Sequence, residues 1–425
     1  MKKIKSIKNG LFSRNISLAR MALGAGKDFL SKKDGDFAQN LIETLESKSG
    51  IITHELGLMK GSVMKAGQTL STYMGEFFPE NVKKLLATLE NQSYFLEWNE
   101  LKKQVPSSWF EQIEFDQNPL AAASIGQVHL GRDKNTGEAY AVKIQYPGIR
   151  RAINRDIFTI KLLVNSLKIA PGKLDISEIY DEIKEMLYQE MNYEQELESI
   201  LEFKSLIGDN PLIKVLTPIE NFCTKDILTT KLSSGHSLRS EHVQGLPQSK
   251  RDELGKAYLN LFCRELYEWA LIQTDGHFGN YLIEIDGENA NWFLLDFGAT
   301  KRLEGDFLNH YRNMISSVIV QDRDKFFDSF KNLGRIDNDK SLNHDLIWEY
   351  LEVMGQPFQS DSYDWGASNI PEQAMAYLPK LMKNLPQGKA PKDTIFIDRK
   401  VASVFYVLKQ LRCKFNAREV FSKYI

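Results

Sequence analysis

The sequence predicts an α+β chain of two lobes, with a helical extension before the first lobe. The first observation is a β pattern from residue 113 to 145, broken by the turn residues 133–137. The second is helical periodicity over residues 36–112 and over most of the chain after 149. The third is a short β-branched run, Ile227–Leu232, before Ser233-Ser234-Gly235, which suits a connector between lobes.

These patterns set the expected domain boundaries. We expect a basic N-terminal segment, a helical extension, a first lobe and a second lobe, at residues 1–35, 36–112, 113–232 and 233–425. In the first lobe, a hairpin ends at Pro147-Gly148, and two helical stretches follow at about 149–169 and 175–207. The second lobe is mainly helical, except for a hairpin before Asp296.

Composition excludes several classes of protein. A chain of 425 residues can bury a sizeable core. Its 54 Lys and Arg balance 56 Asp and Glu, so no global field favours nucleic acid, and we expect no nucleic-acid partner. The three cysteines lack metal-ligand spacing, which suits a reducing compartment. We find no apolar run long enough to span a bilayer and no secretory signal.

The N-terminal segment departs from this neutral balance. All charged residues before Asp28 are Lys or Arg, and apolar residues recur among them at roughly helical spacing. Such a basic amphipathic segment can lie on an anionic membrane surface. It can also act as a transit peptide or form a solvated, frayed arm, and the sequence leaves these alternatives open.

Four residues of the types found at phosphoryl-transfer sites occur in a characteristic order along the chain. Lys143 lies in the strand-like run 139–144, Asp275 and Asn280 are five positions apart, and Asp296-Phe297-Gly298 follows after a hairpin-length segment. This order is typical of a protein-kinase-like fold. Each part alone also suits a surface lysine or an ordinary turn, but the ordered set favours a kinase-like site.

Phosphoryl transfer needs positioned phosphates, metal neutralisation and an oriented acceptor, and each need has a candidate. Lys143 would reach the α/β-phosphates of ATP or ADP. Because an unpaired charge in an apolar strand is costly, Lys143 requires a buried anionic partner, for which we choose Glu196. Asp275 would orient the acceptor or take its proton. Asn280 and Asp296 would bind Mg²⁺ or Mn²⁺ through hard oxygen atoms.

The predicted phosphate loop is unusual. A kinase loop reads G-x-G-x-x-G-x-V, but two of its three glycines are alanines here. A Cβ at those positions restricts positive φ and keeps the backbone away from a phosphate. We expect these residues to line the nucleotide site: Ala121, Ala122, Ala123, Ser124, Gly126 and Val128.

Two motifs carry a family resemblance. Pro119–His129, with Lys65-Ala66-Gly67-Gln68 upstream, resembles the UbiB family of atypical kinases, also called the AarF-domain family. The likeness covers about residues 50–425. Three further segments look most similar to the mitochondrial coenzyme-Q branch of that family: Thr229-Thr230, Gln273-Thr274-Asp275 and Asp296–Thr300.

The resemblance implies several properties. The helix with Lys65, Gly67 and Gln68 is expected to fold over the site and block a protein-substrate groove. ATP and ADP binding, and ATPase activity stimulated by anionic membrane lipid or a quinone-precursor-like lipid, are expected. So is a supporting role in coenzyme Q (ubiquinone) biosynthesis, with other proteins of that pathway as candidate partners. The expected location is cytoplasmic and peripheral to the inner membrane in a bacterium, or the matrix side of the mitochondrial inner membrane.

The chain departs from the family pattern at two positions. The Glu-x-Asp motif that faces the Lys65 helix falls on Glu190-Met191-Asn192, so Asn192 removes a charge. The usual hinge Glu falls on Lys231. A hinge binds adenine mainly through its backbone, so we expect this change to be tolerated. Thr230 and Leu232, on either side, are expected nucleotide contacts.

Three functions compete. The leading one is a membrane-associated ATPase or small-molecule kinase of quinone metabolism. The second is a nucleotide-binding scaffold with little turnover, and the third is a soluble small-molecule kinase of the aminoglycoside or choline type. The presence of Lys143, Asp275, Asn280 and Asp296 favours turnover over a scaffold. The alanine loop and the Lys65 helix count against the third.

Overall fold

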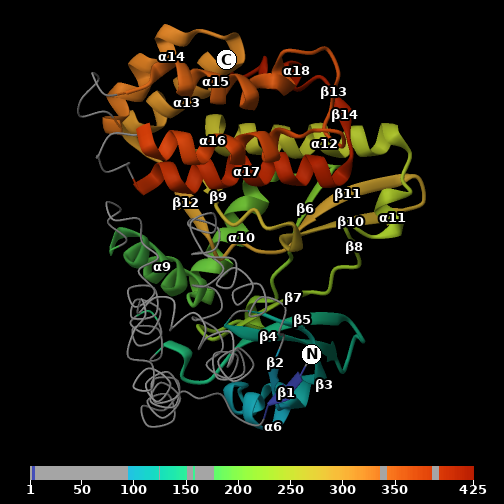
Figure 1. Ribbon diagram of the computed structural model, residues 1–425. Helices are drawn as coiled ribbons and strands as arrows, with labels where there is room; N and C mark the ends of the chain where they lie inside the picture. Colours follow the sequence, from blue (N-terminus) through green and yellow to red (C-terminus); the bar gives the residue numbers. More distant parts are fainter. Residues whose placement is uncertain are drawn as a thin grey trace, which may run out of the picture. The chain divides into compact units, whose positions relative to one another are not determined.

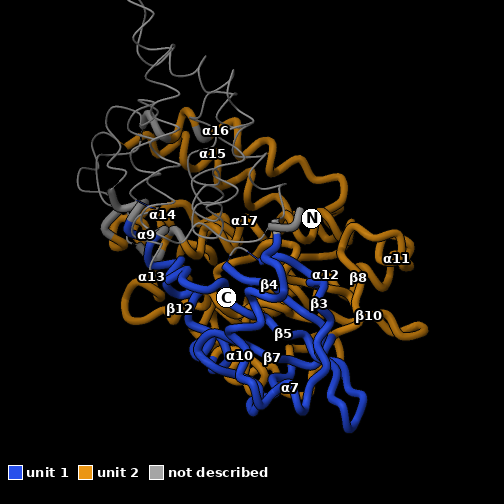
Figure 2. Tube along the Cα trace, turned by 90° about the horizontal axis from the view of Figure 1, so that it is seen from below, with its two compact units in different colours: residues 1–198, 217–232 blue, residues 199–216, 233–425 orange. Residues whose placement is uncertain are grey.

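The chain forms two compact units of mixed helix and strand, so the predicted α+β class is confirmed. Unit 1 comprises residues 1–198 and 217–232, and unit 2 comprises 199–216 and 233–425 (Figure 2). The chain passes from unit 1 to unit 2 at 232/233, and residues 199–216 also belong to unit 2. The computed structural model describes residues 2–4, 94–123, 125–150, 157, 177–335, 342–384 and 392–425.

Unit 1 is built on a four-stranded antiparallel sheet (Figure 1). Its strands, in spatial order, are β3 (Ile113–Ala122), β4 (Gly126–Asp133), β5 (Ala139–Gln145) and β7 (Ile227–Lys231). The predicted hairpin between β4 and β5 is confirmed. Tyr140, Val142 and Ile144 are buried at alternate positions of β5. Because side chains alternate along a strand, Lys143 points to the opposite face of the sheet.

Gly126 is required by the packing of β4 against β5. A Cβ at this position would lie 2.4 Å from the carbonyl oxygen of Ile144 and 3.1 Å from the hydroxyl oxygen of Tyr193. Real Cβ atoms do not approach backbone oxygen so closely, so a side chain would push the strands apart. Strand packing alone therefore accounts for the one glycine that the predicted phosphate loop retains.

The prediction of a wholly helical segment at 36–112 is wrong where the structure describes it. Tyr94–Leu96 forms a strand, β2, that pairs in parallel with β1, Lys2–Ile4. The buried side chain of Gln127 bonds both backbone groups of Leu96, with 2.5 Å from Leu96 N to Gln127 Oε1 and 3.3 Å from Gln127 Nε2 to Leu96 O. These hydrogen bonds satisfy the N–H and C=O groups of an extended backbone at Leu96. Hydrophobic periodicity alone does not reveal such an interaction.

The predicted helix over 175–207 is divided into two, α9 (Ser177–Glu190) and α10 (Tyr193–Ile207). Asn192 begins the second helix, because its Oδ1 accepts a hydrogen bond from the backbone N–H of Gln195 at 3.3 Å. Asn and Asp cap helices about equally well. The departure from Asp at this position therefore keeps the cap while removing a charge.

In the part of unit 1 that the structure describes, the other elements are short. They are α6 (Trp98–Leu101), α7 (Trp109–Gln112) and the 3₁₀ turns Lys102–Gln104 and Glu220–Phe222.

Unit 2 has a four-stranded sheet of order β6-β11-β10-β8, two strand pairs and a helical majority. Its strands are β6 (Ile213–Val215), β8 (His236–Ser237), β9 (Leu271–Gln273), β10 (Tyr281–Asp286), β11 (Asn289–Leu294), β12 (Thr300–Arg302), β13 (Tyr363–Asp364) and β14 (Lys414–Phe415). Its helices are α11 (Glu241–Gln244), α12 (Gln248–Cys263), α13 (Gly305–Val320), α14 (Arg323–Phe330), α15 (His344–Gly355), α16 (Ile370–Asn384), α17 (Lys392–Leu411) and α18 (Ala417–Phe421). The described residues of this unit also form two π-helical turns, Arg264–Glu268 and Lys331–Arg335, and the 3₁₀ turns Phe278–Asn280 and Gln356–Phe358.

The strand connections of unit 2 bring two distant segments together. The β10–β11 hairpin, confirmed as predicted, places the Leu295 N–H 2.9 Å from the Asn280 carbonyl oxygen. β12 then pairs with β9 in antiparallel register, with Thr300 opposite Gln273. The chain around Asp275 therefore lies beside the chain around Asp296.

Candidate active site

The structure contains the predicted ion pair of unit 1. Lys143 Nζ lies 2.9 Å from both carboxylate oxygens of Glu196, which is almost fully buried. The Lys143 ammonium also lies 4.9 Å from the ring centroid of Tyr193, a cation–π distance. A lysine held by two oxygens and a ring has little freedom, so its position at β5 is fixed before any ligand arrives.

The alanine segment is mostly strand. Ala121 and Ala122 belong to β3, opposite Val128 and Gln127 of β4, and the turn is closed by the Ala123 N–H, which donates to the Gly126 carbonyl at 2.9 Å. The predicted loop is thus shorter than expected, since an extended strand costs alanine less conformational entropy than it costs glycine. Ser124 lies outside the described residues.

The expected hinge positions lie at the end of β7. Thr230 is buried and pairs with Ala141 of β5, whereas Leu232 is 42% exposed. Lys231 is half exposed and forms an ion pair with Glu138 at 2.5 Å. The lysine at the hinge position therefore has a local acidic partner in the turn that precedes β5.

In unit 2, Asp275 is held by α17. Arg399 Nη2 lies 2.9 Å from Asp275 Oδ1, and both side chains are largely buried. One turn further along α17, the Ser403 hydroxyl donates to the Gly276 carbonyl. A Cβ at Gly276 would lie 2.0 Å from Ser403 Oγ, so only glycine fits here. Residues 399 and 403, four apart on one helix face, fix the start of the loop.

Asn280 and Asp296 are oriented by backbone contacts. The Asn280 Nδ2 donates to the Asp275 carbonyl at 2.9 Å, which leaves Oδ1 as the ligand atom that the side chain offers to a cation. Asp296 Oδ1 accepts from the Gly298 N–H at 2.9 Å, and Gln273 Nε2 donates to the Asp296 carbonyl. The oxygen donor set suits Mg²⁺ or Mn²⁺.

A buried ion pair stabilises the segment that carries Asp275. Lys400 Nζ lies 2.8 Å from Glu265 Oε2, and each side chain is 1% exposed. Glu265 sits in the π-helical turn after α12 and also accepts from the Gln273 backbone. Burial raises the pKa of the Glu265 carboxyl, and the Lys400 charge and that hydrogen bond oppose the shift. The pair therefore ties α17 to β9, immediately before Asp275.

Residues 88–330, more than half of the chain, match the ABC1 atypical kinase-like domain. The chain belongs to this family. It is the UbiB family that the sequence motifs indicated, and the kinase-like fold is thereby confirmed.

Relatives agree with this membership, and a solved structure agrees with the fold. The mitochondrial atypical kinase COQ8B of Rattus norvegicus is 28% identical over 383 residues, which is 88% of this chain and 71% of its own length. The mitochondrial atypical kinase COQ8 of Saccharomyces cerevisiae is 24% identical over 436 residues, 99% of this chain and 86% of its own. A Mycobacterium tuberculosis protein, solved in complex with erythromycin, has the same fold, with a TM-score of 0.60, 24% identity and coverage of 90% and 97%.

Sequence reasoning omitted the residues that hold the catalytic loop. Arg399 and Ser403 are far from Asp275 along the chain, and no local motif links them to it. The predicted regulatory residues Lys65, Gly67 and Gln68 lie outside the described residues. Glu190 is the last residue of α9.

Proposed function

We propose that this protein is an atypical kinase or ATPase that binds ATP or ADP with Mg²⁺ and supports coenzyme Q biosynthesis at a membrane surface. The observation that carries the proposal is that each unit holds one part of a phosphoryl-transfer set. Unit 1 holds the Lys143–Glu196 pair, and unit 2 holds Asp275, Asn280 and Asp296. In unit 2 the Asn280 side chain donates to the Asp275 carbonyl, and the Asp296 carboxylate accepts from the Gly298 N–H. The COQ8 names of its relatives support the quinone part.

The residues fit a nucleotide with a divalent ion. When bound, the nucleotide supplies the phosphoryl group, and the ion neutralises its charge. Lys143 would bind the α/β-phosphates, held in place by Glu196. Asn280 Oδ1 and the Asp296 carboxylate would be the metal ligands from the protein. Asp275 would orient the acceptor hydroxyl or a water molecule.

The metal assignment is tested by Asp296→Asn. Nucleotide with Mg²⁺ should raise the thermal midpoint of the wild type, because binding to the folded state alone stabilises it. The variant should lose this shift, since the phosphate charge then rests on Lys143 without the ion. Asp286→Asn, which removes an exposed carboxylate of the same hairpin, is the matched control and should keep the shift. An undiminished shift in Asp296→Asn would remove this residue from the metal site.

The proposed association with a membrane surface rests on the basic N-terminal segment, residues 1–35. Most of this segment lies outside the described residues. None of the helices that the structure describes combines the length and apolar character of a membrane span. Two locations stay proposals: the cytoplasmic side of a bacterial inner membrane and the matrix side of the mitochondrial inner membrane. The mitochondrial names of the relatives support the second.

Deleting residues 2–23 should reduce binding to vesicles that contain anionic lipid. The attraction should weaken with salt, because surface charge is screened within about 8 Å at physiological ionic strength. Co-sedimentation with phosphatidylcholine vesicles, with and without cardiolipin, measures it. If the truncated and intact chains sediment equally, the segment is an arm or a transit peptide.

A further inference from the structure

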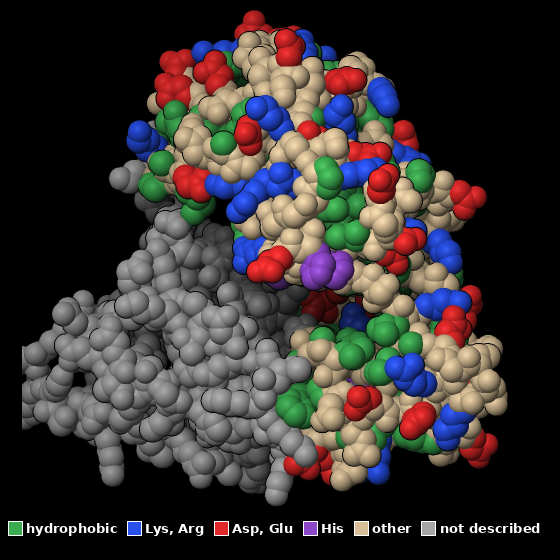
Figure 3. All heavy atoms as spheres, turned by 90° about the vertical axis from the view of Figure 1, so that its right-hand side faces the viewer, with side chains coloured by type: hydrophobic (Ala, Val, Ile, Leu, Met, Phe, Trp, Pro, Cys, Tyr) green, Lys and Arg blue, Asp and Glu red, His purple; other side chains and the backbone are tan. Residues whose placement is uncertain are grey.

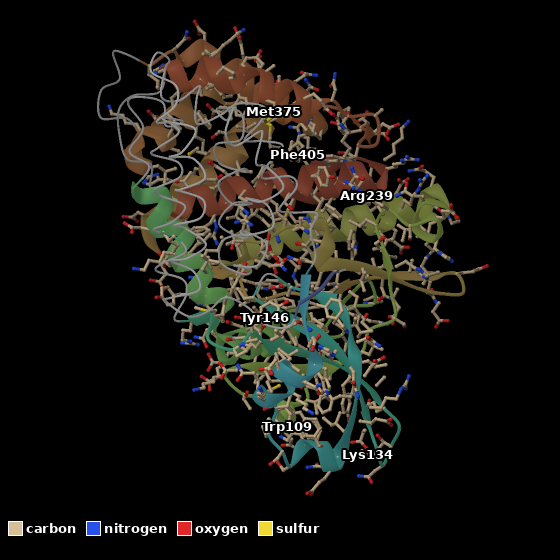
Figure 4. The ribbon with its side chains drawn as sticks, turned by 60° about the horizontal axis from the view of Figure 1, so that its bottom comes forward. Trp109, Lys134, Tyr146, Arg239, Met375 and Phe405 are labelled. Carbon is tan, nitrogen blue, oxygen red and sulfur yellow. The ribbon has the colours of Figure 1, made fainter. Side chains whose placement is uncertain are left out.

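A surface pocket of unit 2 gathers positive charge. It encloses about 370 Å³, and its lining residues are Arg239, Gln244, Gly366, Lys409, Gln410 and Arg412. Arg239 lies beside α17 (Figure 4), where its Nε donates to Gln410 Oε1 at 3.1 Å. On the face drawn in Figure 3, Lys and Arg are interspersed with Asp and Glu, and the chain as a whole carries a net charge of −2. Three cations around one pocket are therefore a local excess.

This excess is only partly neutralised. Within the described part of the chain, neither Arg239 nor Arg412 forms an ion pair with a carboxylate. Lys409 pairs with Glu372 at 2.7 Å, but the Glu372 side chain is 64% exposed, so this contact is weak. Guanidinium groups with unused donors are the side chains best suited to a phosphate, which they bind through two parallel hydrogen bonds.

The backbone at Arg412 gives independent evidence. This residue directly follows α17 and has a φ of 53°, in the left-handed region where glycine is usual. A side chain in this region strains the backbone. Gly366 makes room for it, since a Cβ at 366 would lie 3.1 Å from Arg412 Cα. Strained backbone of this kind clusters at functional sites, which suggests that the arginine side chain is used.

The pocket is also connected to the catalytic loop. The guanidinium of Arg239 lies 4.5 Å from the ring centroid of Phe278, which stands between Asp275 and Asn280 in the sequence. The Phe278 ring in turn lies 5.9 Å from that of Tyr406 on α17. A ligand that draws Arg239 toward the pocket would change its stacking on Phe278.

We propose that this pocket binds a phosphate-bearing ligand and that Arg239 transmits its binding to the catalytic loop through Phe278. The volume exceeds that of a lone phosphate ion, so a phosphate ester is the expected class. A soluble ester and a phospholipid head group share this chemistry. The proposal that this coupling affects catalysis rests on the proposed function, whereas the proposal of a phosphate-binding site does not.

Arg412→Gly is the sharpest test of binding, because glycine suits the backbone at this position. The thermal midpoint should be unchanged or raised, while the affinity should fall about tenfold or more with the loss of charge-assisted hydrogen bonds. The probes are glycerol phosphate, by calorimetry, and phosphatidylcholine vesicles with and without phosphatidic acid, by co-sedimentation. Gln321→Gly is the matched control, since Gln321 has a φ of 61° after α13 and does not line the pocket; it should bind as the wild type does.

Each outcome decides the proposal. Binding of glycerol phosphate assigns a soluble ester. Binding to phosphatidic acid vesicles assigns a lipid head group if it persists when residues 2–23 are deleted and is lost in Arg412→Gly. Lys143→Met, which removes the other expected phosphate contact, should leave this binding intact. If the wild type binds neither probe, or if Arg412→Gly binds as tightly as the wild type, the pocket is not a phosphate site. Its positive charges then only stabilise the C-terminal end of α17.

Hydrogen exchange tests the coupling without requiring turnover, so its outcome is separate from that of the proposed function. In the wild type, the bound probe should slow exchange in the peptide spanning 274–281. Phe278→Leu should keep the binding and lose this protection, since the stacked ring is the link. No protection in the wild type, or equal protection in the variant, would overturn the coupling.

Discussion

Lys400→Met should lower the free energy of unfolding by about 3–5 kcal/mol, the range for removing one partner of a buried ion pair. The variant leaves the Glu265 carboxylate, 1% exposed, without the cation that lies 2.8 Å away. Denaturant unfolding, followed by the fluorescence of buried Trp292 and Trp365, measures the loss.

The double variant Lys400→Met with Glu265→Gln is the matched control. It removes the charge but keeps an oxygen for the Gln273 backbone, so it should recover most of the lost stability. A double variant no more stable than Lys400→Met would mean that packing around the lysine stem, and not the stranded charge, causes the loss.

The same pair predicts a pH dependence with a definite sign. Burial raises the folded-state pKa of Glu265 above the ordinary value of 4.5, and loss of Lys400 should raise it further. A carboxyl with a raised folded pKa contributes stability that is present below the unfolded pKa and is lost as pH rises through the folded pKa. The deficit of Lys400→Met should therefore shrink from pH 7 to about pH 5. A constant deficit would contradict the raised pKa.

Local sequence patterns predicted the strands and the order of the chemistry well. The alternation in residues 139–145 and the turn at 133–137 depend on neighbouring residues, so β4, β5 and their hairpin appeared as expected. Lys143 could be paired with Glu196 because a lysine in an apolar strand has to be neutralised. Burial alone predicts that a buried acidic partner exists; it does not by itself single out Glu196.

The failures came from contacts that no local pattern encodes. Tyr94–Leu96 is a strand because the side chain of Gln127, 31 residues later, bonds its backbone. Arg399 holds Asp275 across 124 residues of sequence, and neither residue has neighbours that reveal the pair. Helical periodicity predicted a mainly helical second lobe but could not say which polar residues of α17 face the catalytic loop.

Asp275→Asn should reduce nucleotide turnover by about 10²–10⁴-fold, the usual contribution of a positioned acid–base group. Binding of nucleotide with Mg²⁺ should remain, because Asn280 is held by the Asp275 backbone carbonyl and not by its side chain. Turnover and the thermal shift with nucleotide, measured on the same sample, separate the two effects. Loss of the thermal shift would show that Asp275 binds the nucleotide complex and does not only orient the acceptor.

Arg399→Gln shows how Asp275 is positioned. The Arg399 guanidinium, 2.9 Å from Asp275 Oδ1, fixes the direction of the carboxylate, so the variant should lower turnover by less than Asp275→Asn does. If Arg399 acts only through Asp275, adding Arg399→Gln to Asp275→Asn should cause no further loss. Arg399→Lys, which keeps the charge, should recover part of the activity lost in Arg399→Gln. If the losses of the two variants instead multiply in the double variant, Arg399 acts independently of Asp275, and the natural target for its charge is the phosphate of the nucleotide.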